Sequence, residues 1–352
     1  ATIVPVFVGY LIGDAAKAHI SDANPALFIA MGIFALAFVI LLFSSIPEPE
    51  LEAAKTAEEE TETTGSLIRG AVSHRNLVFG IIAIFLYVGV EVGIPNTLNN
   101  YLTTKTKAQL VAEIDGNKAI LAELAAPAVD SAADTLATVA MVKKFNVDSL
   151  CVEKKVATSE ELVAVLEKEN AANQEKIDNP EYQEGLGKDT GFAGAVVGFY
   201  WLLMLVGRLL GGVIGGKVSS RAMMSFVSAA AMVLITLGIL LPGATVNFPS
   251  VTNELSFAMV EIPLGVMLFV LCGLCTSVMW GATFNLAVEG LGKYTSIASG
   301  LFMVMVCGGG VVPFVQGLVA DAAGFIPSYW VLVGALAFML WFALFGSKPK
   351  KF

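Results

Sequence analysis

The polar residues that could do chemistry in this sequence interrupt long apolar runs. The segment YVGVEVGIPNTLNNYL (87–102) follows the run LVFGIIAIF and carries Glu91, Asn96 and Asn99. A carboxylate in hydrocarbon costs at least ~2.5 kcal/mol, so such groups usually face a helix-bundle interior or a water-filled path. On a helix, Glu91 and Asn99 lie within about a quarter turn of each other, and Pro95 disturbs the series of backbone hydrogen bonds. A structural hydrogen bond between helices is the alternative interpretation.

A second polar pattern lies in the apolar run 263–288. Thr276, Trp280 and Thr283 recur at spacings of four and three residues, which places them on one helical face. Asn285 falls on the opposite side by the same arithmetic. An aromatic ring beside hydroxyl groups suits a sugar, because the ring stacks on C–H surfaces while polar groups bind hydroxyls. An ordinary packing stripe explains the same pattern.

The run 295–320 contains CGGGVVPFVQG, in which three glycines and Pro313 precede Gln316. Broken helices near the bilayer midplane recur at transporter substrate sites, and a glutamine side chain both donates and accepts hydrogen bonds. Tyr200 is a further candidate for a polar path, although aromatic belts at membrane interfaces use the same residue type.

The string GRLLGGVIGGKVSSR (207–221) nearly matches a phosphate-binding loop. Gly211 and Lys217 fit that motif, but Val218 stands where a serine or threonine must bind magnesium, and no strand precedes it. We therefore expect a tight cytoplasmic turn whose glycines allow close helix approach. Arg208 then lies near the cytoplasmic end of its helix, where it can snorkel or form an ion pair.

Nothing in the sequence predicts an enzyme. His19 and His74 lie in loops, without an H-E-x-x-H motif or a Ser/His/Asp set. Cys272 and Cys275 form a C-x-x-C pattern inside a lipid-length run with no nearby histidine, so we interpret them as packing residues. We expect no catalytic residue, no metal site and no cofactor.

The composition is that of a membrane protein. Hydrophobic residues make up 56% of the chain and charged residues 14%, against roughly 25% charged in soluble domains. Runs long enough to span a bilayer occur at 26–46, 77–98, 191–214, 222–242, 263–288, 295–320 and 327–346. The net charge of -9 is concentrated in one stretch, so nothing supports nucleic-acid binding.

The basic residues predict the orientation of these spans. With 47–76 in the cytoplasm, the cytoplasmic loops hold Lys55, Arg69, Arg75, Lys217, Arg221, Lys293, Lys348, Lys350 and Lys351, whereas the short outer loops hold Lys17 alone. The positive-inside rule then makes the C-terminus cytoplasmic. Residues 1–13 are too short to span and begin with alanine, and we expect them to be the end of a helix from a longer protein.

Two polar stretches separate the spans. The acidic segment within 47–76 fits a flexible cytoplasmic linker. Residues 103–190 lie outside and carry sixteen acidic and ten basic residues. Thr158, three residues before Glu161, predicts a helix start, and 130–145 reads as another helix. We expect a small helical insert rather than a binding module.

Four strings occur together in a known order and spacing: YVGVEVGIPNTLNNYL, GFYWLLMLVGRLLGG, FNLAVEGLGKYTSIASG and GGGVVPFVQGLVADAAG. In this the chain resembles the fucose/galactose/glucose–cation symporters, a branch of the major facilitator superfamily. The resemblance covers the chain except the insert. It implies an all-α polytopic membrane protein with a partial major facilitator fold, running from the end of helix five through helix twelve. In that family two six-helix bundles enclose a central sugar site that opens alternately to each side.

The resemblance also bears on the substrate. The fucose branch has glutamine at the position of Glu91, whereas the glucose/galactose-like branch has glutamate. Many members have proline at the position of Gly281 and an aliphatic residue at that of Thr283, which leaves another hexose or an amino sugar open. The acidic residues for proton coupling lie on helices one and four of the family, outside this chain.

These observations lead to one expectation: a secondary transporter that takes up a glucose/galactose-like hexose by proton or sodium symport. We expect a monomer, multi-pass in the inner membrane, whose partners are the sugar, the cation and the lipid bilayer. The alternatives are a facilitator-fold carrier of a non-sugar solute and a membrane sensor whose insert binds a ligand.

The expected division of the chain is the end of the N-terminal bundle (1–46), the linker (47–76), helix seven (77–102), the insert (103–190), helices eight to twelve (191–346) and a tail (347–352). The expected substrate-binding residues are Glu91, Asn96, Asn99, Tyr200, Trp280, Thr283, Asn285 and Gln316. The expected structural or gating residues are Arg208, Gly211, Lys217, Arg221 and Pro313.

Overall fold

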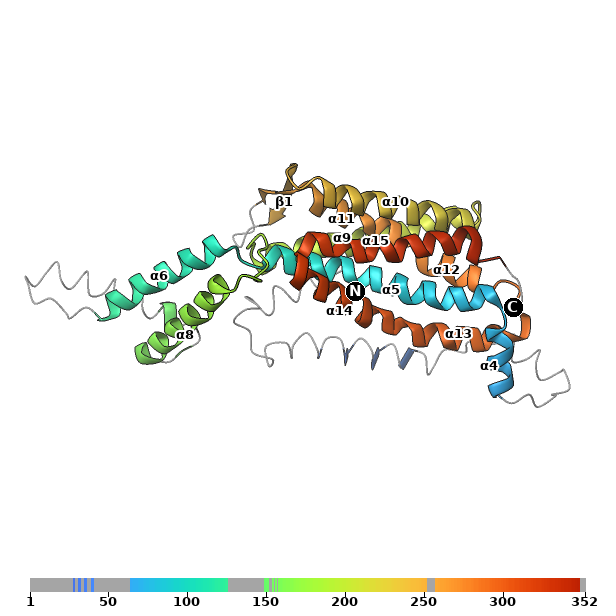
Figure 1. The fold of residues 1–352 in the computed structure, drawn as a ribbon, viewed down its shortest axis with the longest axis horizontal. Helices are drawn as coiled ribbons and strands as arrows, with labels where there is room; N and C mark the ends of the chain where they lie inside the picture. The colour runs from blue at the N-terminus through green and yellow to red at the C-terminus, as the bar shows by residue number, and fades with distance from the viewer. Residues whose placement is uncertain are drawn as a thin grey trace, which may run out of the picture. The chain divides into compact units, whose positions relative to one another are not determined.

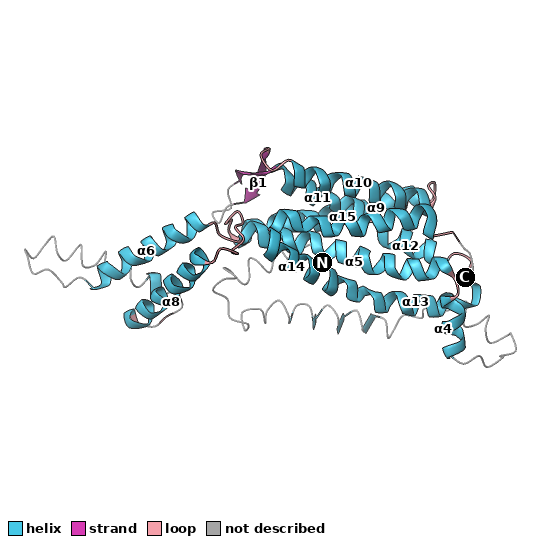
Figure 2. Ribbon diagram, viewed as in Figure 1, coloured by secondary structure: helices cyan, strands magenta, loops and turns pink. Residues whose placement is uncertain are grey.

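The architecture is a bundle of membrane-length helices, seen in a computed structural model of the chain (Figures 1 and 2). The structure describes residues 28, 31–32, 35–36, 39–40, 64–125, 149–151, 154, 156, 158–251 and 257–348. Within these residues, six helical segments have the length and hydropathy to cross a membrane: Arg75–Thr103, Thr190–Gly215, Ser220–Leu240, Leu264–Val288, Gly292–Ala323 and Phe325–Gly346. They coincide with six of the seven expected runs, and 26–46 falls largely outside the described residues.

The helices of the bundle are α4 (Thr64–Val72), α5 (Arg75–Thr103), α9 (Thr190–Gly215), α10 (Ser220–Leu240), α11 (Leu264–Thr276), α12 (Met279–Val288), α13 (Thr295–Val304), α14 (Gly308–Ala323) and α15 (Phe325–Trp341). Short helical turns complete it: η2 (Gly292–Tyr294), η3 (Met305–Cys307) and η4 (Phe342–Gly346). The packed neighbours include α9 with α11, α10 with α11 and α15, and α14 with α15.

Side-chain caps fix where two of the spans begin. Asp189 accepts a hydrogen bond from the Phe192 N–H at the start of α9, and Ser219 accepts one from Ala222 at the start of α10. Each cap satisfies one backbone donor that the first helical turn leaves free. The polar residues in the turns therefore position the apolar helices that follow them.

Two of the expected continuous spans are interrupted. The run 263–288 consists of α11 and α12, which separate at Ser277–Val278. The run 295–320 changes to a 3-10 turn at Met305–Cys307, before the three glycines. We expected the glycines and Pro313 to break that helix; instead α14 contains both, because its first residue is Gly308 and its helical pattern continues through Pro313.

Close backbone approaches hold the bundle together. A Cβ on Gly308 of α14 would lie 2.0 Å from the Phe85 carbonyl oxygen of α5, and one on Gly265 of α11 would lie 2.6 Å from the Gly238 carbonyl oxygen of α10. Small residues at such contacts are typical of membrane helix packing. The glycines therefore set the spacing of these helix pairs.

Two elements of the bundle were not expected. Strands β1 (Thr245–Val251) and β2 (Phe257–Pro263) form an antiparallel hairpin between α10 and α11, with Thr245 opposite Pro263. The Phe248 ring packs edge-on against Phe192 of α9. Within the expected linker 47–76, Thr64–Val72 forms α4, and a Cβ on Gly70 of that helix would meet the Tyr294 ring at 2.5 Å. The acidic stretch that predicts flexibility, up to residue 63, lies outside the described residues.

Residues Thr103–Lys188 form a separate compact unit. Its helices are α6 (Lys107–Ala125) and α8 (Ser159–Asp178). Thr158 caps α8 by accepting from the Glu161 N–H, as its spacing predicts. The helix expected at 130–145 lies outside the described residues.

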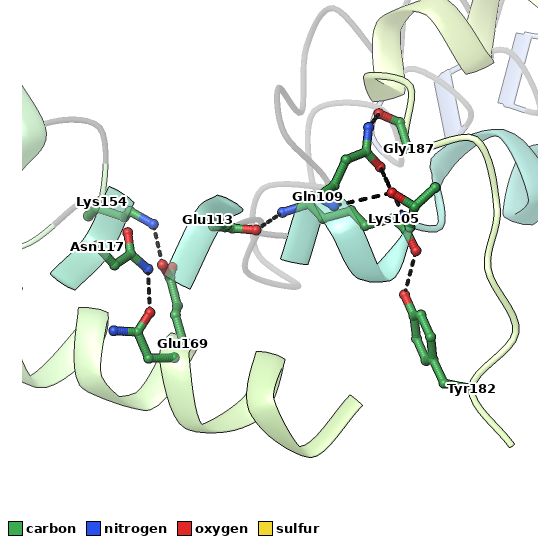
Figure 3. A network of polar contacts seen from close by, with 10 residues as sticks. Lys105, Gln109, Glu113, Asn117, Lys154, Glu169, Tyr182 and Gly187 are labelled. Atoms are coloured by element: carbon green, nitrogen blue, oxygen red, sulfur yellow. Dashed lines mark hydrogen bonds and ion pairs between the residues drawn. The ribbon is translucent and has the colours of Figure 1, made fainter. Parts of the chain in front are cut away.

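Polar contacts join the parts of this unit (Figure 3). Asn117 of α6 donates to Asn170 of α8 at 2.9 Å, and Lys154 pairs with Glu169. Lys107 Nζ donates to the Ile177 carbonyl at 3.0 Å, where it satisfies an acceptor at the end of α8. In the described part of the unit, amide and ammonium groups thus link α6 to α8, and the buried apolar side chains of these helices are Leu110, Ile114, Leu162 and Leu166.

Candidate functional site

An ion pair inside the bundle is the centre of the candidate site. Arg208 Nη2 of α9 lies 3.3 Å from Glu91 Oε1 of α5. Glu91 is sixteen residues after Arg75, which places it ~24 Å along α5, well inside the span. The Glu91 side chain is 14% exposed and that of Arg208 is 55% exposed. The carboxylate is therefore largely enclosed, whereas the guanidinium reaches an open face of the bundle.

Pro95, inside α5, accounts for a second polar contact at the same residue. Proline has no N–H, so the carbonyl four residues earlier, that of Glu91, loses its helical donor. The Tyr200 hydroxyl lies 3.2 Å from that carbonyl oxygen and 3.1 Å from Thr276 Oγ1. Glu91 is thus contacted by α9 twice, once at its backbone and once at its side chain.

Small residues bring α9 close to α11 and α12. A Cβ on Gly273 would lie 2.4 Å from the Tyr200 carbonyl oxygen, and one on Gly207 would lie 2.3 Å from Ser277 Oγ. Gly211 has the same relation to Val278, at 2.1 Å. Gly207 and Gly211 of the near phosphate-loop string therefore pack against the junction of α11 and α12, whereas a Cβ on Gly216 would meet nothing within 4 Å.

An aromatic pair lies one helical turn from Glu91. Tyr87 precedes Glu91 by four residues and so lies on the same face of α5. Its ring meets that of Trp280 at 6.1 Å between centroids, at an angle of 65°. The expected residue Trp280 thus belongs to the surroundings of Glu91, through Tyr87.

Gln316 lies elsewhere. Its side chain is fully buried and neither amide atom has a hydrogen-bond partner. A Cβ on Gly93 would lie 2.6 Å from Gln316 Oε1. Gly93 follows Glu91 by two residues, about 160° around α5. The structure therefore places Gln316 on the opposite side of α5 from the ion pair, against Leu332 of α15.

Thr283 and Asn285 are also separated from the pair. Thr283 is fully buried, and its hydroxyl lies 3.7 Å from Met224 Sδ of α10. Asn285 is exposed and donates to Ser220 Oγ, at the start of α10, at 3.4 Å. Both residues face α10, so the stripe of Thr276, Trp280 and Thr283 is divided among different neighbours.

The remaining expected residues are spread over the bundle. Asn96 is exposed and Asn99 half-buried, both beyond Pro95 on α5. Pro313 is buried within α14. Lys217 is exposed in the turn after α9. Arg221 Nε donates to Ser347 Oγ at 3.2 Å, which links the start of α10 to the residue after η4.

Sequence reasoning missed two residues that contact these helices. Tyr329 of α15 donates to the Ile94 carbonyl at 3.0 Å. Asn76, fully buried, donates to the carbonyls of Ala287 at 2.9 Å and Glu289 at 2.8 Å, where α12 ends. A helix end needs such donors, but no sequence signal indicates which distant side chain supplies them.

The arrangement suits recognition rather than bond-breaking chemistry. It combines a carboxylate, a guanidinium and a hydroxyl with an adjacent aromatic pair. Among the residues that the structure describes, no group of three or more His, Cys, Asp or Glu side chains could hold a metal ion.

Comparison with known proteins gives the chain a set of relatives. It is 23% identical over 350 residues to a protein named glucose/galactose transporter of Brucella abortus, covering 99% of this chain and 60% of that one. It is 30% identical to a putative glucose/galactose transporter of Helicobacter pylori over 158 residues, 44% of this chain and 34% of the relative. An L-fucose-proton symporter of Escherichia coli is 36% identical over 78 residues, 22% of this chain and 18% of the symporter.

The fold has a solved counterpart. A crystal structure of FucP, a major facilitator superfamily transporter, in the outward conformation superposes with a TM-score of 0.54 at 16% identity, covering 92% of this chain and 55% of FucP. No family model matches the chain. The chain spans about 60% of the length of the Brucella relative.

These findings agree with the expectations of family and fold and with the exclusion of an enzyme, since the relatives are named as transporters. The chain is a multi-pass membrane protein with the major facilitator fold. Its sequence relatives carry the names glucose/galactose transporter and L-fucose-proton symporter, in line with the resemblance to the fucose/galactose/glucose–cation symporters.

Proposed function

We propose that the protein takes up a hexose of the glucose or galactose class by cation symport, with the Glu91–Arg208 pair at the substrate path. The observation that carries this proposal is an ion pair inside membrane-spanning helices with its guanidinium open. An arginine exposed to hydrocarbon costs ~2.5–3.5 kcal/mol even on the most permissive scales. Its exposure is therefore explained best by a polar path next to α9.

The chemistry around the pair matches a sugar. A carboxylate accepts hydrogen bonds from sugar hydroxyls, a guanidinium donates to them, and an aromatic ring covers an apolar sugar face. Glu91, Arg208 and Trp280 supply these three functions from α5, α9 and α12. The names of the relatives, glucose/galactose transporter and L-fucose-proton symporter, support the same class of solute.

The other expected residues receive different roles in this proposal. Asn96 and Asn99, on α5 beyond Pro95, line the outer part of the path. Gln316 and Thr283 serve helix packing, because each is enclosed by neighbouring helices. Asn285 acts at the α10 contact. We further propose a monomer in the inner membrane with a cytoplasmic C-terminus, and no bound cofactor besides the transported proton or sodium ion.

The experiment is uptake of labelled glucose, galactose and fucose by vesicles that contain the complete protein, with and without proton and sodium gradients. Gradient-driven uptake of one hexose is expected, and the effective gradient identifies the ion. Competition with organic anions is the control, because an open arginine could also attract an anion. Absence of hexose uptake under either gradient, with uptake of an anion, would replace the sugar by a non-sugar solute.

A further inference from the structure

We infer that Tyr200 is a positioning residue for Glu91: its hydroxyl binds the carbonyl that Pro95 leaves without a helical donor, and so fixes the backbone from which the carboxylate projects. The inference rests on the proposed function for its transport readout. It adds a residue whose effect on the solute passes through the backbone of α5.

The acceptor follows from helix arithmetic. In α5 each N–H donates to the carbonyl four residues before it. Position 95 is a proline, so the Glu91 carbonyl has no such donor, and the proline ring also pushes that carbonyl away. An orphaned carbonyl inside a membrane bundle must find another donor, because no lipid group replaces it. The Tyr200 hydroxyl, at 3.2 Å, is that donor.

The Tyr200 ring has little freedom to leave. It is fully buried, and its backbone lies against Gly273 of α11. Its oxygen is 3.1 Å from Thr276 Oγ1. A tyrosine hydroxyl has one proton, so while it donates to the Glu91 carbonyl it is an acceptor for Thr276, whose own proton is shared with the Cys272 and Gly273 carbonyl oxygens at 3.2 Å. The result is a chain of hydrogen bonds from α11 through α9 to α5, in which each bond polarises the next.

The same helix also holds the Glu91 side chain. Arg208 follows Tyr200 by eight residues on α9, ~12 Å along the axis. Helical side chains tilt toward the N-terminus of their own helix, which directs the Arg208 guanidinium back toward Tyr200 and Glu91. Tyr200 fixes the backbone of Glu91 and Arg208 its carboxylate. Loss of the tyrosine hydroxyl should therefore displace the carboxylate from its guanidinium.

Tyr329 offers a matched control close to Pro95. It also donates from a buried tyrosine to an α5 carbonyl, that of Ile94, at 3.0 Å. The Ile94 carbonyl keeps its regular helical donor, the N–H of Leu98, since residue 98 is not a proline. Removal of the Tyr329 hydroxyl therefore leaves no orphaned acceptor.

The test is a double-mutant cycle in the complete protein. Tyr200→Phe removes the donor, and Pro95→Ala supplies the missing N–H at position 95. The hexose KM and maximal rate are measured for Tyr200→Phe, for Pro95→Ala and for the double variant. A control cycle replaces Tyr200→Phe by Tyr329→Phe, alone and combined with Pro95→Ala. Pro95→Gly provides the N–H with a flexible backbone, in case alanine straightens α5. Thermal unfolding of the same proteins is a readout that needs no sugar.

We expect Tyr200→Phe to raise the hexose KM about five- to tenfold, the effect of one lost hydrogen bond. In the Pro95→Ala or Pro95→Gly background, where position 95 has an N–H, most of this increase should disappear. Tyr329→Phe should give the same fold-change in both backgrounds. If both Pro95 variants are inactive, the same rescue should be seen in the unfolding temperature. An equal effect of Tyr200→Phe with and without Pro95 would overturn the inference.

The two proposals can fail separately. A wild-type protein that takes up no hexose contradicts the proposed function. The thermal-unfolding cycle still decides whether Tyr200 binds the carbonyl that Pro95 exposes, because it requires no transport.

Discussion

The bundle and the insert both contain carboxylate–cation pairs, but these pairs have different surroundings. In the bundle, Glu91 and Arg208 come from different membrane-spanning helices. In the insert, Lys105 pairs with Glu113 on α6, and both side chains are substantially exposed to solvent. Such exposed pairs contribute ~0–1 kcal/mol. A pair removed from water leaves a costly unpaired charge when one partner is deleted.

The difference shows which polar residues the fold constrains. In the insert, both members of the Lys105–Glu113 pair are open to solvent, so water can take the place of either partner. In the bundle, Glu91 has an arginine at its side chain and a tyrosine at its carbonyl, and the Tyr200 side chain is fully buried. We therefore expect mutations of equal chemistry to have unequal effects in the two units.

Arg208→Met gives the largest expected effect. It leaves the enclosed Glu91 carboxylate unpaired, and because Arg208 is itself half-exposed we expect a loss of about 1–3 kcal/mol in the free energy of unfolding rather than the full cost of a buried pair. Hexose uptake should fall at least about tenfold, the effect of ~1.4 kcal/mol.

Glu91→Gln added to Arg208→Met is the control. It removes the unpaired charge, so part of the lost stability should return while uptake remains low. Equal stability of the single and the double variant, measured by thermal unfolding in nanodiscs, would show that the two charges are not coupled.

Variants at Gly93 and Gln316 test whether this side of α5 serves helix packing, in contrast to the side that carries the ion pair. Gly93→Ala places a Cβ 2.6 Å from Gln316 Oε1, and such overpacking costs about 1–3 kcal/mol. Gln316→Met removes two buried amide atoms that have no partner, so we expect a change within about 1 kcal/mol. The hexose KM should stay within about twofold for Gln316→Met. A tenfold rise in KM would return Gln316 to the substrate path.

Lys105→Ala in the insert gives the smallest expected effect. Its side chain is 46% exposed and that of its partner Glu113 is 30% exposed, so a loss of about 1 kcal/mol or less is expected. Uptake should be unchanged, and its salt dependence should match that of the wild type. Loss of uptake in this variant, at normal membrane abundance, would show that the insert contributes to transport and would contradict the comparison.

The sequence singled out Glu91 and Arg208 by residue type, but it did not show that the two side chains contact each other. Glu91 and Arg208 stood out because charges are rare in lipid-length runs, and the spans followed from hydropathy. Gln316 was selected on the same grounds, yet the contact of α14 with Gly93 places it behind α5. Which face of a helix meets which neighbour depends on the packing of α9, α14 and α15, which a single sequence does not encode locally.

Local rules succeeded where the partner was near in the chain. Thr158 capped α8 three residues before Glu161, as predicted. Pro95 indicated an orphaned carbonyl at Glu91, but its donor, Tyr200, lies 109 residues away. The hairpin of β1 and β2 was missed because Pro249 lies inside β1 and is unusual within a strand.

The most direct test of the central claim is equilibrium hexose binding to the purified complete protein, compared among wild type, Glu91→Gln and Lys105→Ala. If the Glu91–Arg208 pair lies at the substrate path, Glu91→Gln should raise the dissociation constant at least about tenfold, the loss of a charged hydrogen bond, while Lys105→Ala should bind like the wild type. Equal binding by all three proteins would contradict the claim and leave the ion pair as a structural contact between α5 and α9.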